Sequence, residues 1–501
     1  MTLSREACYR ALRTRDARFD GRIFVAVRTT GIYCRPICPA RCPKLENVTF
    51  YPSAAAAQEA GYRPCLRCRP ESSPDLAAWR GTSNTVQRAL TLIAGGALDG
   101  DAHDVDGLAA RLGIGERQLR RLFQHHLGAS PIAVAQTRRV LFAKQLIHET
   151  RMSMLDVAVA AGFGSVRRFN DTFHRLYGRP PSALRRETTG GRRPSARPAG
   201  ITLRLSYAPP YDWEAMIDFL AARAIAGVEV VERDCYRRTI GLDADRGTIE
   251  VRPLADRHAL TATIHFPNVR ALPTIVARIR RVFDLGADIG RIAAQLAEDT
   301  QLAPLVAARP GLRVAGAWDG FELAVRAVLG QQITVVAARR LLGKLAAAYG
   351  EVLEPAAGLT TVFPRPERLA TANLAALGMP RARAATLAAL AANAVADPRL
   401  FEAEDDLPAT IARLRALPGV GEWTAQYIAM RALREPDAFP AADLGLLRAL
   451  ADADGTRPTA AALLARAEAW RPWRAYAAQH LWTAGTAAPL APSRPRQEAV
   501  A

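Results

Sequence analysis

The stretch Leu417–Asp443, LPGVGEWTAQYIAMRALREPDAFPAAD, decides the architecture of the C-terminal half of the chain. An apolar-periodic segment, Ile411 to Leu417, runs into Pro-Gly-Val-Gly, and a second helical segment, 423–433, follows at once. So tight a turn between two helices needs glycine, because the backbone bends sharply and stands close to its partner. The free N–H groups at the start of the second helix suit one phosphate. A phosphate grip followed by one carboxylate, Asp443, predicts chemistry on a nucleic acid.

This stretch closely resembles the helix-hairpin-helix element of DNA glycosylases, and within them the AlkA-type 3-methyladenine glycosylases. The resemblance implies that Asp443 is catalytic. It also implies that the backbone near Gly419 and Gly421, together with Thr424, contacts the DNA. For the hairpin motif alone, an ordinary helical hairpin with a surface aspartate is the alternative.

Three aromatic residues stand at positions that match the base pocket of this family: Trp423, Tyr427 and Trp482. An electron-rich aromatic face attracts the positive charge of an alkylated purine. The alternative is that these side chains belong to the core. The family inserts a leucine into the space that the flipped base leaves, and the matching position here, in G-Q-Q-I-T, is Gln332. Either Gln332 or Ile333 is expected to fill that gap.

The length and charge of the chain constrain its number of domains and the class of its partners. Its 501 residues predict about three domains. Lys and Arg exceed Asp and Glu by 67 − 48 = 19, which favours nucleic acid before membrane as a partner, with a basic proteome bias as the alternative. No apolar run approaches the roughly 20 residues of a membrane span, and a signal-peptide pattern is absent. We therefore expect a monomeric, cytoplasmic, nucleoid-associated bacterial protein with reduced cysteines.

The N-terminal region holds a cysteine cluster. Two close pairs, C-x3-C and C-x2-C, have metal-ligand spacing and predict a four-thiolate zinc site made by Cys34, Cys38, Cys65 and Cys68. Cys42 is near enough for a different set of four, and buried free cysteines are a further alternative. Basic side chains crowd the cluster: Arg28, Arg35, Arg41, Lys44, Arg63, Arg67 and Arg69. A cationic surround favours thiolate over thiol and attracts phosphate.

Residues 1–76 closely resemble the methyl-acceptor domain of Ada proteins, through FVAVRTTGIYCRP, ENVTFYPSAAAAQEAGYRPC and the final C-x2-C-R-P. The resemblance implies one zinc ion held by the four cysteines. It also implies that Cys34 is the nucleophile that takes a methyl group from a methylphosphotriester in DNA. A zinc-bound thiolate stays deprotonated at neutral pH and attacks a soft carbon. The alternative is a purely structural zinc ion that stabilises a small domain.

Residues 85–186 are predicted to be helical and contain two helix-turn-helix patterns, DVDGLAARLGIGERQLRRLFQHHLGASP and MSMLDVAVAAGFGSVRRFNDTFHRLYGRPPSALRR. The pair resembles the DNA-binding domain of AraC-type regulators, with recognition helices at 116–126 and 165–177. Candidate DNA contacts on these helices are Arg117, Gln118, Arg120, Arg121, Arg167, Arg168 and Asn170. Arg, Asn and Gln suit base edges and the remaining Arg suit phosphates. For any single residue a phosphate contact or a solvated position is the commoner outcome.

The remaining segments complete the predicted order. Residues 187–200, rich in Gly, Pro and Arg, predict a flexible linker. Residues 201–307 alternate strand and helix patterns and resemble the AlkA N-terminal α+β subdomain. Residues 308–490 resemble the helix-hairpin-helix glycosylase core, and 491–501 are expected to be a disordered tail. No lysine follows Gly421, where bifunctional relatives carry one, so the resemblance implies a monofunctional enzyme.

Together these patterns predict a multidomain α+β protein: a small zinc-bound α/β domain, an all-α double helix-turn-helix domain, an α+β subdomain and a helix-hairpin-helix core. The resemblances imply a DNA alkylation-damage response protein that senses methylphosphotriesters, activates transcription and hydrolyses the N-glycosidic bond of alkylated bases. Double-stranded DNA is the expected partner, and RNA polymerase is a candidate partner. The alternatives are a transcription factor with an inactive glycosylase module, or a repair enzyme whose front half only targets DNA.

Overall fold

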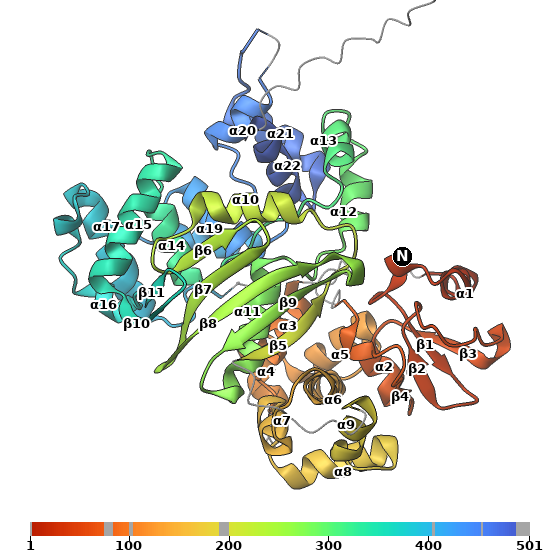
Figure 1. Cartoon of the computed structure of the whole chain (residues 1–501). Coiled ribbons are helices and arrows are strands. Elements are labelled where there is room, and N and C mark those ends of the chain that lie inside the picture. The colour runs from red at the N-terminus through yellow and green to blue at the C-terminus, as the bar shows by residue number, and fades with distance from the viewer. Residues whose placement is uncertain are drawn as a thin grey trace, which may run out of the picture.

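The computed structural model describes residues 3–74, 84–99, 104–189, 200–402, 406–451 and 454–486. It is a multidomain α+β protein, as predicted, and Figure 1 shows the N-terminal domain in red, the helix-turn-helix domain below it in orange to gold, and a green sheet leading into teal and blue helices. Most of the expected linker 187–200 and all of the expected tail 491–501 lie outside the described residues. Within the described ranges, no helix combines the length and apolarity needed to cross a membrane.

The N-terminal domain is a small sheet flanked by helices. Its strands lie in the order β3-β1-β2-β4, and β2 and β4 are parallel neighbours. The fully buried Tyr33 on β2 anchors its core. The elements are α1 (Arg5–Thr14), η1 (Ala17–Phe19), β1 (Phe24–Val27), β2 (Ile32–Cys34), η2 (Leu45–Asn47), β3 (Val48–Tyr51), α2 (Ala54–Glu59), β4 (Arg63–Pro64) and η3 (Pro70–Ser72).

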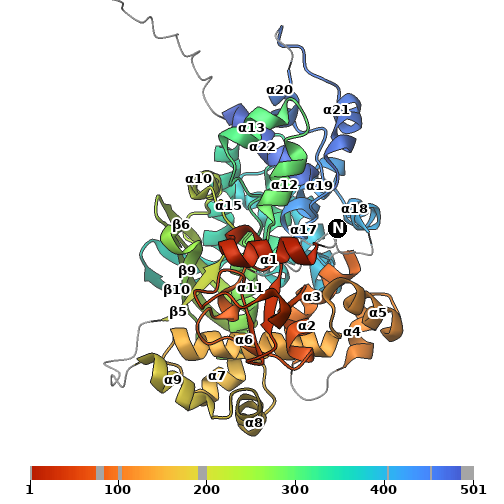
Figure 2. The same ribbon diagram turned by 90° about the vertical axis from the view of Figure 1, so that its right-hand side faces the viewer.

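The second domain contains both predicted helix-turn-helix units. The first recognition helix is α5, capped at its end by Gly128 in the left-handed region, and the second is α8, capped at its start by Ser165. Both agree with the expected ranges within one residue. The helices are α3 (Asn84–Ala94), α4 (Val105–Arg111), α5 (Glu116–Leu127), α6 (Pro131–Glu149), α7 (Met154–Ala160), α8 (Val166–Tyr177) and α9 (Pro181–Thr189). The long helix α6 joins the two units and runs beneath the N-terminal domain (Figure 2).

An antiparallel five-stranded sheet follows, in the order β5-β9-β8-β7-β6. Its apolar face is regular, because residues at alternate strand positions such as Leu203, Leu205, Ile249 and Val251 are buried. The elements are β5 (Ile201–Ser206), α10 (Trp213–Arg223), β6 (Glu229–Glu232), β7 (Cys235–Leu242), β8 (Asp245–Leu254), η5 (Ala255–Arg257), β9 (Ala259–His265), η6 (Val269–Ala271) and α11 (Leu272–Val282).

The helical domain buries one large apolar cluster. Its elements are α12 (Ile289–Leu296), α13 (Leu302–Ala308), α14 (Gly320–Leu329), α15 (Val335–Tyr349), β10 (Glu351–Ala356), β11 (Leu359–Val362), α16 (Pro366–Ala370), η7 (Leu374–Leu377), α17 (Arg381–Ala396), α18 (Leu407–Arg415), α19 (Glu422–Arg431), α20 (Leu444–Ala449), α21 (Ala460–Ala467), η8 (Glu468–Trp470) and α22 (Arg474–Thr486). Helices α12 and α13 pack into this cluster although they precede the boundary expected at 307 and 308. The hairpin β10–β11 was not expected, since helical patterns dominate the surrounding sequence.

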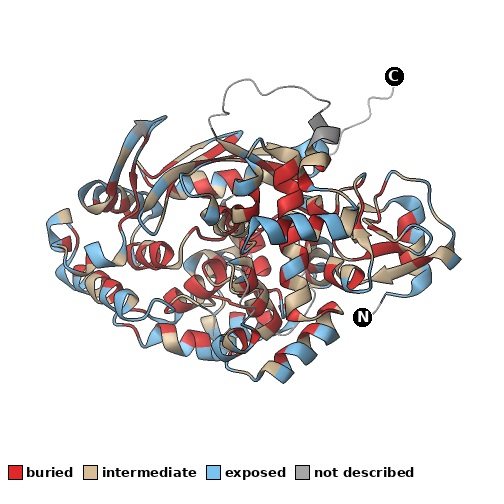
Figure 3. Cartoon of the chain, turned by 90° about the horizontal axis from the view of Figure 1, so that it is seen from below, coloured by how far each residue is buried: buried red, intermediate tan, exposed pale blue. Residues whose placement is uncertain are grey.

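The second helix-turn-helix unit and the five-stranded sheet share one hydrophobic core. Ile147 and Phe169 from the helices belong to the same buried cluster as Leu203 and Ile264 from the sheet. Seen from below, buried segments are continuous through the middle of the molecule, and exposed segments lie at its rim (Figure 3). The helix-turn-helix domain and the sheet that follows it in the chain therefore pack against each other.

Candidate active site and metal centre

The predicted hairpin consists of α18, a turn, and α19. Gly419 has φ +74°, and a Cβ there would meet Oγ1 of Thr386 at 2.5 Å, so only glycine lets the turn pack against α17. Gly421 is the N-cap of α19 and makes no side-chain cap hydrogen bond. A Cβ on Gly421 would meet nothing within 4 Å. The first amides of α19 thus open onto free space, the arrangement that binds a phosphate.

Gln331, which sequence reasoning missed, ties this turn to a second one. Its Nε2 donates to the carbonyl oxygen of Gly419 and to the hydroxyl of Thr424, at 3.0 Å each. Thr424 is only 2% exposed, and its hydroxyl accepts from Gln331. Its expected contact with DNA stays a prediction, for which the backbone N–H is better placed than the hydroxyl. The neighbouring Gln332 is exposed with φ +58°, at the tip of the second turn, and stays a candidate for filling the gap in the DNA.

Asp443 is held by four hydrogen bonds. It is the N-cap of α20, and its Oδ1 accepts from the amides of Gly445 at 2.8 Å and Leu446 at 3.1 Å. The indole Nε1 of Trp482 donates to Oδ1 and that of Trp423 to Oδ2, each at 2.8 Å. All four donors require an acceptor carboxylate, and the helix N-terminus favours negative charge. Asp443 is thus a fixed anion.

The three predicted pocket aromatics lie together around this anion. The rings of Trp423 and Tyr427, one turn apart on α19, are stacked with centroids 5.3 Å apart and planes at 10°. Trp482 on α22 meets Tyr427 edge-on at 6.4 Å and 65°. All three rings and Asp443 are partly exposed, and Tyr427 and Trp482 also pack against the core of the helical domain. The sequence did not point to Gly445 as part of this site. A Cβ on Gly445 would come within 3.1 Å of the Trp482 ring, so a larger residue there would crowd that ring.

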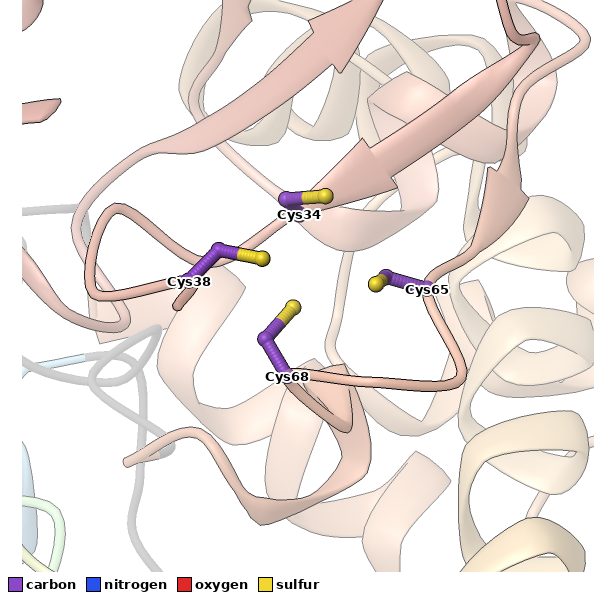
Figure 4. A group of neighbouring side chains, drawn as sticks. All are labelled: Cys34, Cys38, Cys65 and Cys68. Atoms are coloured by element: carbon purple, nitrogen blue, oxygen red, sulfur yellow. The ribbon is translucent and has the colours of Figure 1, made fainter. Parts of the chain in front are cut away.

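The four predicted cysteine ligands form one cluster, with the four sulfur atoms all within 4.8 Å of one another: Cys34, Cys38, Cys65 and Cys68 (Figure 4). The parallel pairing of β2 and β4 places the first and third of these side by side. Four thiolates at this separation suit a tetrahedral zinc ion, whose Zn–S bonds are about 2.3 Å. The exposed Cys42 is not part of the cluster, which removes the alternative ligand set.

Cys34 differs from the other three ligands in its exposure. Its side chain is partly exposed, whereas Cys38, Cys65 and Cys68 are buried. In the zinc loops two backbone amides donate to sulfur: that of Arg35 to Cys68 Sγ at 3.4 Å and that of Arg67 to Cys65 Sγ at 3.3 Å. Such bonds stabilise thiolate charge. Among the four ligands, Cys34 is thus the one residue that is not fully buried.

The basic surround of the cluster divides into two groups. The side chain of Arg35 pairs with the buried Asp20, and Arg69 pairs with Glu71 and Glu149. These two guanidinium groups hold the fold together. Of the other five, Arg63 is half-buried, and four are exposed: Arg28, Arg41, Lys44 and Arg67. Arg28 donates to the Glu46 carbonyl oxygen, and Lys44 lies 3.8 Å from the Glu46 carboxylate.

The candidate DNA contacts of the helix-turn-helix units are all exposed on their recognition helices: Arg117, Gln118, Arg120 and Arg121 on α5, and Arg167, Arg168 and Asn170 on α8. Arg120 forms an ion pair with Glu116, and Arg167 lies 3.8 Å from Asp171. Leu119 and Phe123, and likewise Phe169 and Phe173, fill the opposite, buried faces. The polar faces are thus presented to solvent.

Family comparisons match four segments of the chain. The matching descriptions are the metal binding domain of Ada (residues 7–71), a helix-turn-helix domain (108–187), the AlkA N-terminal domain (202–319) and the HhH-GPD superfamily of base excision DNA repair proteins (325–475).

Individual relatives cover the whole chain or its second half. A protein of Mycobacterium tuberculosis named "Probable bifunctional transcriptional activator/DNA repair enzyme AlkA" is 44% identical over 95% of this chain and 96% of its own length. DNA-3-methyladenine glycosylase 2 of Escherichia coli is 36% identical over 56% of this chain and 95% of its own. The solved 3-methyladenine DNA-glycosylase of Archaeoglobus fulgidus, 24% identical, covers 56% of this chain and 97% of its own with a TM-score of 0.51, a likeness of fold.

Proposed function

Because the chain belongs to the family of bifunctional transcriptional activator/DNA repair enzymes, we propose that it combines a DNA-3-methyladenine glycosylase with a methylphosphotriester acceptor that activates transcription. The glycosylase assignment rests on one observation above all: Asp443 is fixed by two indole donors beside a stack of aromatic rings, next to an uncapped hairpin helix. The protein acts on double-stranded DNA, in the bacterial cytoplasm at the nucleoid.

The excision mechanism follows from these groups. A base inside a duplex is out of reach, so the nucleotide is flipped out. The amides at Gly419 and Gly421 hold the backbone, and Gln332 or Ile333 enters the emptied stack. Trp423, Tyr427 and Trp482 then enclose a base that already carries positive charge.

Asp443 performs the chemical step by electrostatics. As the glycosidic bond breaks, positive charge develops on the sugar, and a fixed carboxylate stabilises that charge more in the transition state than in the ground state. The base leaves with the electron pair of the broken carbon–nitrogen bond and becomes neutral, a water molecule adds to the sugar carbon, and the proton that this water loses passes to solvent. No lysine follows Gly421 to form a covalent bond with the sugar, so the enzyme is monofunctional and leaves the strand uncut.

Cys34 is the methyl acceptor. Zinc bound by the four cysteines would keep their sulfur atoms deprotonated at neutral pH. The Cys34 sulfur attacks the methyl carbon of a methylphosphotriester, the carbon–oxygen bond breaks, and the phosphodiester leaves with the electron pair. The product is a thioether with one negative charge fewer on the domain. Weaker repulsion from DNA phosphates then tightens promoter binding by α5 and α8, which brings RNA polymerase to a promoter as a further partner.

Base release from methylated DNA by the intact protein and by Asp443→Asn tests the glycosylase. We expect the substitution, which keeps the side-chain shape but removes the charge, to slow release at least about a hundredfold. No release by the unmutated protein would favour the rival proposal, a transcription factor with an inactive glycosylase module.

Mass analysis after exposure to methylated DNA tests the acceptor. One added methyl group on Cys34, absent in Cys34→Ser, is the expected result, and methylation elsewhere would contradict it. Promoter affinity measured before and after methylation tests the switch. A gain below about tenfold, ~1.4 kcal/mol, would leave the front half as a DNA-targeting module only.

A further inference from the structure

A small cavity lies between the five-stranded sheet and the helices α10, α14 and α19. Its volume is about 20 Å³, which exceeds the roughly 10–15 Å³ that one water molecule needs, so the cavity has room for one small group. Its charged lining comes from five elements, α10, β6, β7, α14 and α19, whose labels are grouped in Figure 1. The charged residues are four arginines and two glutamates: Arg223, Arg238, Arg326, Arg431, Glu229 and Glu322.

Both carboxylates of the lining are already paired with two of these arginines. Glu322 pairs with Arg238 and with Arg326 at 2.7 Å each. Glu229 pairs with Arg326 at 2.6 Å and also accepts from the hydroxyl of Tyr236 at 2.7 Å. These two anions and two cations compensate each other. Among the described residues of the lining, the two remaining arginines therefore have no carboxylate to compensate them.

The two remaining arginines, Arg223 and Arg431, lie close to each other. Their guanidinium carbons are 3.8 Å and 4.7 Å from the centre of the same ring, that of Phe219. Arg431 is 6% exposed and donates to two backbone carbonyl oxygens and to the phenol oxygen of Tyr427. Arg223 donates to the carbonyl oxygen of Phe219 at 3.3 Å. Carbonyl and phenol oxygens satisfy N–H groups, but they do not neutralise the positive charge.

Two neighbouring guanidinium charges in the interior require a counter-ion. A buried ion is costly to remove from water unless an opposite charge compensates it, and a like charge at short range raises that cost. Burial lowers the pKa of Arg431, and the positive charge of Arg223 lowers it further. Arginine nevertheless keeps its proton in proteins. The compensation must therefore come from an anion and not from the loss of a proton.

We propose that the cavity binds one monatomic anion of the size of chloride, held by Arg223 and Arg431. A guanidinium group has five N–H donors, more than the three acceptors described above for Arg431, so donors remain for the anion. Phosphate, sulfate and carboxylate ligands have several heavy atoms and are too large for this volume. The anion binds the folded chain and not the unfolded chain, so it stabilises the fold. It does so at the last turn of α19, whether or not the protein is a glycosylase.

Bromide locates the site directly, because it is close to chloride in size and has a measurable anomalous X-ray signal. Crystals of the full chain soaked in sodium bromide should show an anomalous peak inside the cavity, in contact with the guanidinium groups of Arg223 and Arg431. A cavity that holds only water, while bromide occupies sites on the basic surface, would overturn the proposal.

Thermal unfolding tests the anion in solution. At constant ionic strength, replacing methanesulfonate, which is too large for the cavity, with chloride should raise the melting temperature of the zinc-loaded full chain. The rise should reach at least about 2 °C and then saturate, as expected for a single site. Arg223→Met keeps an unbranched stem over the Phe219 ring but removes the charge, so it should lose most of this rise.

Arg278→Met is the matched control. Arg278 stacks on Trp318 at 5.5 Å and pairs with Asp319 at 3.4 Å, and it is not part of the cavity lining. This variant loses the same charge from the protein and should keep the full rise with chloride. Equal chloride responses in Arg223→Met and Arg278→Met would refute the site, since they would show that chloride acts on the protein surface as a whole.

Discussion

The same four hydrogen bonds support two roles of Asp443. As the N-cap of α20 it accepts from two backbone amides, and between two indole donors it lies beside the proposed base pocket. A carboxylate so constrained is preorganised, and it stabilises charge in the transition state without having to reorient. Residues that only donate to Asp443 should therefore matter for the reaction although they transfer no proton.

Trp482→Phe tests this preorganisation. The substitution keeps an aromatic ring beside Tyr427 but removes the Nε1 donor to Oδ1 of Asp443. A hydrogen bond to a charged group contributes about 1.5–3 kcal/mol, so single-turnover base release should slow about tenfold to a hundredfold. Trp213→Phe is the control, because its indole donates to the Arg233 carbonyl oxygen in another region. Equal rates for both variants would contradict the role of Trp482.

His480 makes the stability of the fold depend on pH. Burial on α22 lowers its pKa from 6.5 to about 4. In the unfolded chain the imidazole takes up a proton near its ordinary pKa of about 6.5. Between pH 6.5 and 4 the unfolded state thus binds more protons than the folded state. This contribution to stability is complete above pH 6.5 and is lost as the pH falls towards 4, by at most about 3 kcal/mol.

Thermal unfolding at pH 7 and pH 5 measures this effect. His480→Gln should lose less stability than the unmutated protein between these two values. A His265→Gln variant, on the exposed end of β9, should lose as much as the unmutated protein. An unchanged pH dependence in His480→Gln would rule out the assignment.

At the scale of elements, two turns form one platform, which is the surface proposed to contact DNA. Gln331 links the turn after α14 to the hairpin turn between α18 and α19. Arg383 at the start of α17 donates to the Gln331 carbonyl oxygen at 2.8 Å. Two positions of this platform require glycine, each for a different physical reason. Gly419 is required by its left-handed backbone and its close approach to Thr386 on α17, and Gly421 by the open space beside the start of α19.

Substituting alanine for each glycine in turn should distinguish these two reasons. Gly419→Ala forces a left-handed residue with a Cβ against Thr386, so we expect the free energy of unfolding to fall by about 2 kcal/mol. Gly421→Ala has room for its Cβ and should leave the melting temperature nearly unchanged while weakening DNA binding several-fold, because the methyl group stands where a phosphate approaches. Denaturation curves and DNA titrations of both variants check this pair, and the reverse assignment would refute it.

At the scale of the whole molecule, helix α6 holds the three parts together. Lys144, fully buried, donates to Glu71 at 2.7 Å and to the carbonyl oxygen of the zinc ligand Cys65 at 2.8 Å. One turn on, Glu149 accepts from Arg69 of the N-terminal domain and from Arg204 on β5 of the sheet. The zinc loop, the helix-turn-helix domain and the sheet are thus connected through one helix.

Lys144→Met tests this junction. It removes the Lys144 bonds to Glu71 and to the Cys65 carbonyl oxygen and leaves the buried Glu71 carboxylate with Arg69 as its remaining ion-pair partner. Because breaking a buried ion pair costs up to about 3–5 kcal/mol, the N-terminal domain should lose stability and release zinc to a chelator faster. Lys44→Met is the control, because Lys44 lies 3.8 Å from Glu46 with both side chains exposed, and such pairs contribute about 0–1 kcal/mol. Similar zinc-release rates for the two variants would contradict the role of Lys144.

The sequence by itself determined the local chemistry. The spacing of Cys34, Cys38, Cys65 and Cys68 predicted the zinc site, and the resemblance of the hairpin stretch to DNA glycosylases pointed to Asp443 and to the aromatic residues that lie beside it. These features are readable because each depends on a few residues at fixed spacing. The exposed faces of α5 and α8 followed from helical periodicity in the same way.

Only the tertiary structure decided which partners these groups have. Thr424 turned inward to Gln331, Cys42 was left out of the zinc cluster, and Asp443 gained two indole donors, one of them from a residue far away on α22. The common core of the helix-turn-helix unit and the sheet likewise joins segments separated by long stretches of chain. Spacing carries no information about such contacts, because they depend on how whole elements pack.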